Sequence, residues 1–79
     1  MGIEETVQRL EDVLIEFRLG SWQVFIKGEC VATFTDGPMQ RTLVAHCAKK
    51  ASKCLLVDEI FIVGEEHKAN AMRNIISLA

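Results

Sequence analysis

Three cysteines and two histidines are the residues of this chain best able to do chemistry. Thiolate and imidazole groups bind zinc, and a Cys–His pair can supply a nucleophile and its general base. His46 and Cys47 are consecutive in a segment with helical periodicity, so their side chains diverge by about 100° and do not converge on one ion. Cys30, Cys47 and Cys54 contain no C-x2-C pair. The spacing therefore predicts no metal site, no cofactor and no enzymatic activity.

The same cysteines are better explained as free thiols. Their number is odd, and the N-terminus lacks the basic region and apolar core of a secretory signal. We therefore expect a reducing, cytoplasmic setting without disulfides. Cysteine is among the most frequently buried residue types, and Cys47 falls on the apolar arc of a predicted helix. The thiols are therefore expected to be buried, and Cys47 to react slowly.

Charge and length exclude several classes of function. Eleven acidic and nine basic residues give a net charge of −2, which disfavours a strongly basic nucleic-acid binder. No apolar run reaches about 18 residues, so we expect no membrane span. The glycines form neither of the two glycine-rich loops that cradle nucleotide phosphates. With 79 residues, the chain is expected to form one domain over residues 1–79, with little room for a deep substrate pocket.

One cluster of basic residues stands out against this acidic background. Arg41, Lys49 and Lys53 lie on the polar side of a predicted helix, and Lys50 lies at its border. Four cations on one helix face can steer an acidic partner, or bind nucleic acid weakly. No stacked-aromatic motif of an RNA-binding sheet accompanies them. We predict that these four residues bind a partner, and an acidic protein surface is favoured over nucleic acid.

Hydrophobic periodicity predicts six elements that would position these residues. The spacing of apolar residues changes between a helical period and a period of two along the chain. Glycine turns and the Asp36-Gly37-Pro38 stretch mark the boundaries. The predicted order is helix 3–18, strand 22–26, strand 30–35, helix 38–52, strand 60–63 and helix 65–78. This is an α+β class, α-β-β-α-β-α, with a β-hairpin in a small three-stranded sheet and helices over one face.

Part of this pattern resembles a known group of domains. The resemblance rests on five consecutive features of the sequence. They are Trp22-Gln23-Val24, a glycine turn, a strand ending in Phe34-Thr35-Asp36, a helix, and the stretch 61–68 (FIVGEEHK). They are similar to short bacterial and phage domains of unknown function with a hairpin–helix–strand core, and to small phage anti-CRISPR proteins. The similarity covers about 50 residues, from Ser21 to Asn70, and departs from the family in the two outer helices. It implies no catalytic residues.

Two classes of function follow from these observations. The first is a protein-interaction module, most concretely an inhibitor encoded by a phage or mobile element. The second is a nucleic-acid-binding accessory domain that uses the basic helix face. A homodimer is also expected, because Phe25 and Val31 would point away from the helices and the outer helices carry more apolar residues than three strands can cover.

Overall fold

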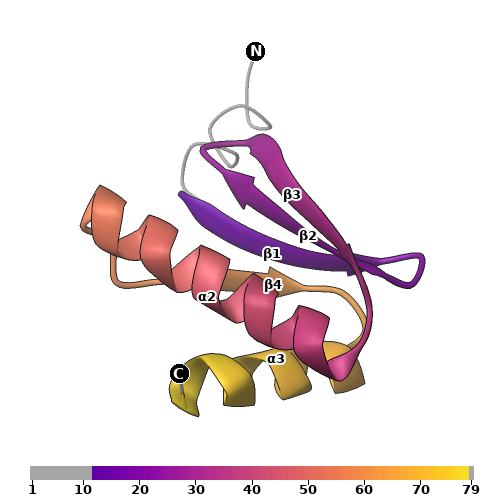
Figure 1. Cartoon of the computed structure of the whole chain (residues 1–79). Coiled ribbons are helices and arrows are strands. Elements are labelled where there is room, and N and C mark those ends of the chain that lie inside the picture. Colours follow the sequence, from indigo (N-terminus) through magenta and orange to yellow (C-terminus); the bar gives the residue numbers. More distant parts are fainter. Residues whose placement is uncertain (1–11, 79) are drawn as a thin grey trace.

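The computed structural model describes residues 12–78, which form a four-stranded sheet and two helices (Figure 1). Three strands come first, then a long helix, a short strand and a final helix. Their bounds are β1 (Val13–Arg18), β2 (Ser21–Ile26), β3 (Glu29–Thr35), α2 (Pro38–Leu55), β4 (Phe61–Val63) and α3 (Glu66–Leu78). The α+β class, the hairpin and both described helices were predicted. The element order and the number of strands were not.

The sheet is mixed, with strand order β3-β2-β1-β4. The first three strands form an antiparallel meander, whereas β4 pairs in parallel with β1 and places Ile62 opposite Ile15. Both turns of the meander have a non-glycine residue followed by glycine, Leu19-Gly20 and Lys27-Gly28, all with positive φ. Two consecutive left-handed residues match the right-handed twist of the flanking strands.

The predicted helix 3–18 is wrong where the structure describes it. Residues 13–18 form β1, and residues 1–11 lie outside the described part of the chain. Val13, Leu14 and Phe17 fit a helical stripe, but Val13, Ile15 and Phe17 also fit one face of a strand. Pairing decides between the two, because β1 lies at the centre of the sheet and bonds to β2 on one side and β4 on the other. The fourth strand follows directly from this correction.

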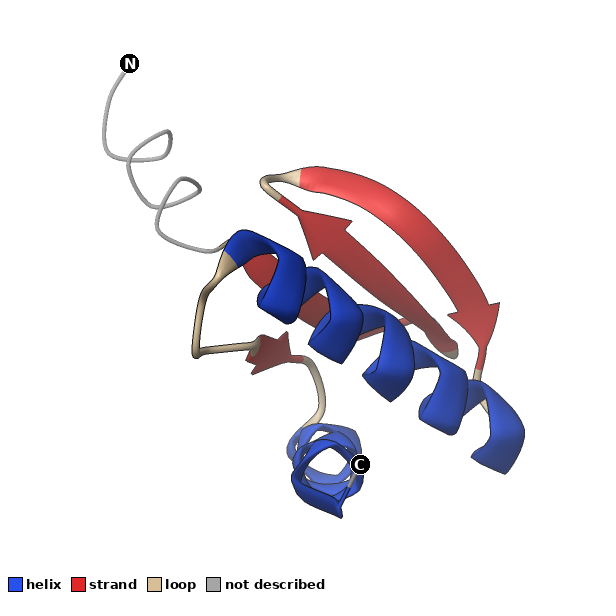
Figure 2. Ribbon diagram, turned by 60° about the vertical axis from the view of Figure 1, so that its left-hand side comes forward, coloured by secondary structure: helices blue, strands red, loops and turns tan. Residues whose placement is uncertain are grey.

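Both helices lie over the same face of the sheet (Figure 2). Helix α2 packs on β1, β2 and β3, and α3 packs on β4 and α2. Three alanines of α2, Ala45, Ala48 and Ala51, are buried and allow its backbone to approach the strands closely. Leu43 is apolar and has helical spacing with Cys47 and Ala51, but it is 45% exposed.

The core is built from alternate strand residues and the inner faces of the helices. Trp22 is its largest fully buried side chain, and Met72 of α3 is fully buried in the same cluster. The buried cluster comprises Val13, Ile15, Trp22, Val24, Val44, Ala45, Ala48, Ala51 and Met72. Between residues 12 and 78, neither helix has the length and apolar character needed to cross a bilayer.

Candidate functional site

Three lysines and a histidine of α2 line one hollow on the surface. His46, Lys49, Lys50 and Lys53 surround a volume of about 280 Å³. They follow one another at spacings of three, one and three residues, which places them on neighbouring turns of one helix face. His46, Lys50 and Lys53 are exposed, and Lys49 is half-buried. We call this feature the cationic hollow.

The three lysines are not equivalent. The Lys49 ammonium donates to the backbone carbonyl of Ile76 in α3 at 3.3 Å, so the second helix fixes the position of this charge. Lys50 and Lys53 have no ion-pair partner among residues 12–78. Their charges are therefore available to a ligand. Lys50, predicted at the border of the polar side, lies on the exposed side of α2.

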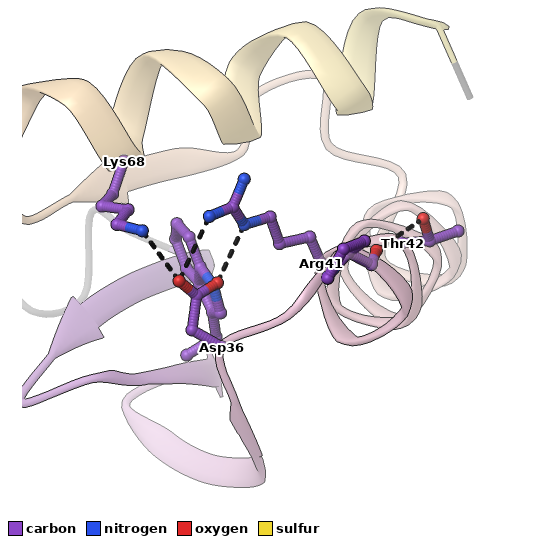
Figure 3. Close-up of polar contacts among 6 residues, drawn as sticks. Asp36, Arg41, Thr42 and Lys68 are labelled. Atoms are coloured by element: carbon purple, nitrogen blue, oxygen red, sulfur yellow. Dashed lines mark hydrogen bonds and ion pairs between the residues drawn. The ribbon is translucent and has the colours of Figure 1, made fainter.

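Arg41, the fourth predicted residue, does not belong to the hollow. Its Nε donates to Oδ1 of Asp36 at 2.8 Å, and its second guanidinium nitrogen donates to Oδ2 at 3.1 Å (Figure 3). A bidentate pair of this kind holds the guanidinium in one orientation. The predicted four-residue patch therefore divides into three lysines at the hollow and one arginine engaged within the fold.

Asp36 accepts two further hydrogen bonds. Lys68 of α3 donates to Oδ2 at 2.8 Å, and the Trp22 indole donates to Oδ1 at 2.8 Å. The hydrogen bond from Arg41 and then that from Lys68 hold the pKa of Asp36 far below its usual value, against the opposing effect of burial. The same contact raises the pKa of Arg41. Asp36 thus links β2, α2 and α3, and this arrangement is structural.

An aromatic pair contacts this ionic cluster through Trp22 and Lys68. The rings of Phe17 and Trp22 have centroids 4.7 Å apart and are tilted by 55°. The Lys68 ammonium lies 5.3 Å from the centroid of the Phe17 ring, within the range of a cation–π contact. The Lys68 ammonium therefore pairs with Asp36 and also contacts the Phe17 ring, so it is not free to bind a partner.

The cysteines are free but less buried than predicted. Cys30 and Cys54 are exposed, and Cys47 is half-buried beside the core. Cys30 is exposed because it lies on the edge strand β3, and Cys54 because it lies on the outer side of α2, which core propensity alone does not reveal. Over residues 12–78, no three His, Cys, Asp or Glu side chains gather in a way that could hold a metal ion.

Apolar side chains extend the cationic hollow toward the start of α2. Met39 is 71% exposed and Leu43 is 45% exposed. Met39, Leu43, His46 and Lys50 follow at spacings of four, three and four residues, so they form a line along the helix. We call Met39, Leu43, His46, Lys50 and Lys53 the α2 outer face. Methionine in such a surface adapts its shape to different partners.

A second hollow carries the opposite charge. Asp12, Asp58 and Glu59 line it together with Val57 and Phe61, and its volume is about 270 Å³. It adjoins the turn that follows α2, whereas the cationic hollow lies on α2 itself. The surface charge is therefore segregated, although the net charge of the chain is only −2.

Comparison of the chain with protein-family models, with curated proteins and with solved structures found no match. The resemblance to short bacterial and phage domains therefore stays a prediction. What this chain does has to be inferred from its own surface.

Proposed function

We propose that this chain is a non-enzymatic protein-interaction module that binds an acidic partner through the α2 outer face. The observation that carries the proposal is the convergence of His46, Lys49, Lys50 and Lys53 on one hollow. Two of these lysines have no ion-pair partner among the described residues, so a ligand does not have to displace an existing contact. A module that acts by occupying its partner's surface would be an inhibitor.

The chemistry of the α2 outer face specifies its partner. Lys50 and Lys53 require carboxylates, while Met39 and Leu43 require apolar side chains about two to three helical turns away. An acidic amphipathic segment supplies both. The lysines accelerate association and set orientation, and the apolar contact slows dissociation.

Nucleic acid is the alternative partner, since phosphates also fit a cationic hollow. The exposed Met39 and Leu43 favour protein, because a phosphate backbone offers nothing apolar to pack against them. The net charge of −2 adds long-range repulsion of a polyanion. If nucleic acid binds through the three lysines, log affinity against log salt has a slope of about −2 to −3.

Two labelled probes separate these possibilities. One is an acidic helical peptide with glutamates on one face and leucines at a spacing of four, and the other is a 20-nucleotide single-stranded DNA. We expect the peptide to bind, and Lys50→Glu with Lys53→Glu to weaken its binding about tenfold or more at low salt. Preferential binding of the DNA would instead favour the nucleic-acid function.

The matched control has the same charge change elsewhere. Lys27→Glu with Arg73→Glu alters two exposed cations, one in the β2–β3 turn and one on α3, and leaves the hollow intact. This control should bind the peptide nearly as well as the original chain, apart from a small uniform loss from net charge. Equal weakening in both double variants would show that the hollow has no special role.

A further inference from the structure

One face of the sheet has no helix over it in the described part of the chain. Helices α2 and α3 both lie on the opposite face (Figure 2). Val13, Ile15 and Trp22 point into the helix-covered core, so the residues that alternate with them point the other way. We call this second surface the open face.

The register of the sheet places a row of apolar side chains across the open face. Phe25 of β2 lies opposite Leu14 of β1, which in turn lies opposite Phe61 of β4. On the other side, Phe25 lies opposite Cys30 of β3. These residues are consecutive cross-strand partners, so they cross all four strands. Leu14, Phe25 and Phe61 are only half-buried, so part of each side chain remains in contact with solvent.

The rest of the open face is mostly polar, and it carries charges of both signs. The next row holds Thr33, Gln23, Glu16 and Val63, the last of which is 42% exposed, and beyond it lie Thr35, Ser21 and Arg18. Glu16 and Arg18 have opposite signs, and the acidic hollow adjoins the apolar row at Phe61. The open face is therefore matched neither by a purely acidic surface nor by a purely basic one. This differs from the α2 outer face, whose lysines would repel their copies.

We propose that the open face is a self-association surface, on which a second copy of this chain packs with the two apolar rows in contact. A two-fold axis makes such a contact self-complementary, because the same row is contributed by both copies. The mixed charge favours a second copy over an acidic partner, because a second copy presents charges of both signs in return. This surface is distinct from the α2 outer face, and the inference does not depend on the function proposed for that face.

The size of the open face sets the strength of the dimer. Strands β1, β2 and β3 are six or seven residues long and β4 is three residues long. At a spacing of about 4.8 Å between strands, they give a flat footprint of about 350 Å², and projecting side chains add to the accessible area. Specific interfaces begin at about 600 Å² of accessible surface per partner. The open face reaches the lower end of this range only if most of it is covered, so we expect a dimer that dissociates at micromolar concentration.

The exposed cysteines provide a test that needs no substitution. Cys30 belongs to the row, whereas Cys54 lies on α2 away from the open face, and both are exposed. When the concentration of the full chain rises from about 1 to about 300 µM, we expect thiol labelling of Cys30 to slow while labelling of Cys54 stays constant. Protection of Cys54 instead, or rates independent of concentration for both thiols, would overturn the proposal.

A pair of matched variants tests the row itself. Phe25→Thr and Gln23→Thr change the same face of the same strand, and threonine suits a strand in both places. Sedimentation equilibrium should show a dimer Kd raised about tenfold or more by Phe25→Thr and nearly unchanged by Gln23→Thr. A full chain that remains monomeric throughout would contradict the proposal. So would equal dimerisation of both variants.

Discussion

The indole nitrogen of Trp22 donates a hydrogen bond of 2.8 Å to Oδ1 of Asp36, although fourteen residues separate them. Trp22 is fully buried, so its only polar group requires an acceptor at the edge of the core. Asp36 provides it at the point where β3 ends and α2 is about to begin. The same carboxylate then binds Arg41 and Lys68, which connects the sheet to both helices.

Asp36→Asn should therefore destabilise the fold. The amide oxygen can still accept from Trp22, but the ion pairs with Arg41 and Lys68 are lost, and these side chains are less than one-third exposed. We expect the free energy of unfolding to fall by about 1–2 kcal/mol, measured by urea denaturation. Arg73→Gln, which removes an exposed contact to Asn70, is the control and should change stability by less than about 0.5 kcal/mol.

Asp36 should also make stability depend on pH. Its pKa is lowered in the folded chain, so its contribution is complete above the ordinary carboxyl pKa of about 3.9 and is lost as pH falls toward the folded value. Unfolding measured between pH 7 and pH 2.5 should show stability decreasing on the acid side. The decrease should be smaller in Asp36→Asn. Identical slopes in the two proteins would assign the acid sensitivity to other carboxylates.

Leu56→Gly should stabilise the protein. Leu56 caps the C-terminus of α2 in the left-handed conformation, with φ of 59°, and is 91% exposed. Glycine adopts this conformation without a Cβ clash, and little packing is lost from so exposed a side chain. We expect a gain of about 0.5–1 kcal/mol in thermal or urea unfolding. Leu56→Ala keeps the backbone cost and should show no such gain.

Gly64→Ala should be harmful where Gly28→Ala is mild. An added Cβ at Gly64 would lie 2.8 Å from the Phe17 carbonyl oxygen and 3.0 Å from the Phe17 Cβ, and the residue has φ of 133°. Gly28 also has positive φ, but no atom lies within 4 Å of a new Cβ. We expect a loss of about 2–4 kcal/mol for Gly64→Ala and about 1 kcal/mol for Gly28→Ala. Similar losses at both positions would mean that backbone conformation alone sets the cost.

Local signals in the sequence predicted the elements that short-range chemistry determines. Pro38 begins α2 as its fixed φ suggests, and Gly28 lies in the predicted hairpin turn. Asp36 and Gly37, in the stretch that marks this boundary, are both residue types that can cap a helix beginning at Pro38. Gly37 occupies the cap position, whereas the Asp36 carboxylate accepts hydrogen bonds from Trp22, Arg41 and Lys68. That use of Asp36 depends on α3, which no local pattern reveals.

Long-range pairing explains what was missed. The identity of β1 depends on β4, whose sequence lies far along the chain, so periodicity over residues 13–18 could not decide between helix and strand. At the candidate site, the helical wheel grouped Lys49, Lys50 and Lys53, and these residues line one hollow in the structure. The wheel also included Arg41, because it cannot show the pairing of Arg41 with Asp36, which lies outside the helix. It omitted His46, although the spacing of His46 from Lys49, Lys50 and Lys53 places it on the same side of the helix.

The parallel contact between Leu14 and Phe61 also fixes the order in which this chain can finish folding. The meander of β1, β2 and β3 can form while the chain is being synthesised, because its turns are short. The central strand β1 nevertheless keeps a bare edge until β4 leaves the ribosome and closes a long loop against it, a step with a high entropic cost. A nascent chain stopped before Phe61 exposes unpaired strand edges on both sides, and such chains are the ones we expect to aggregate or to need a chaperone.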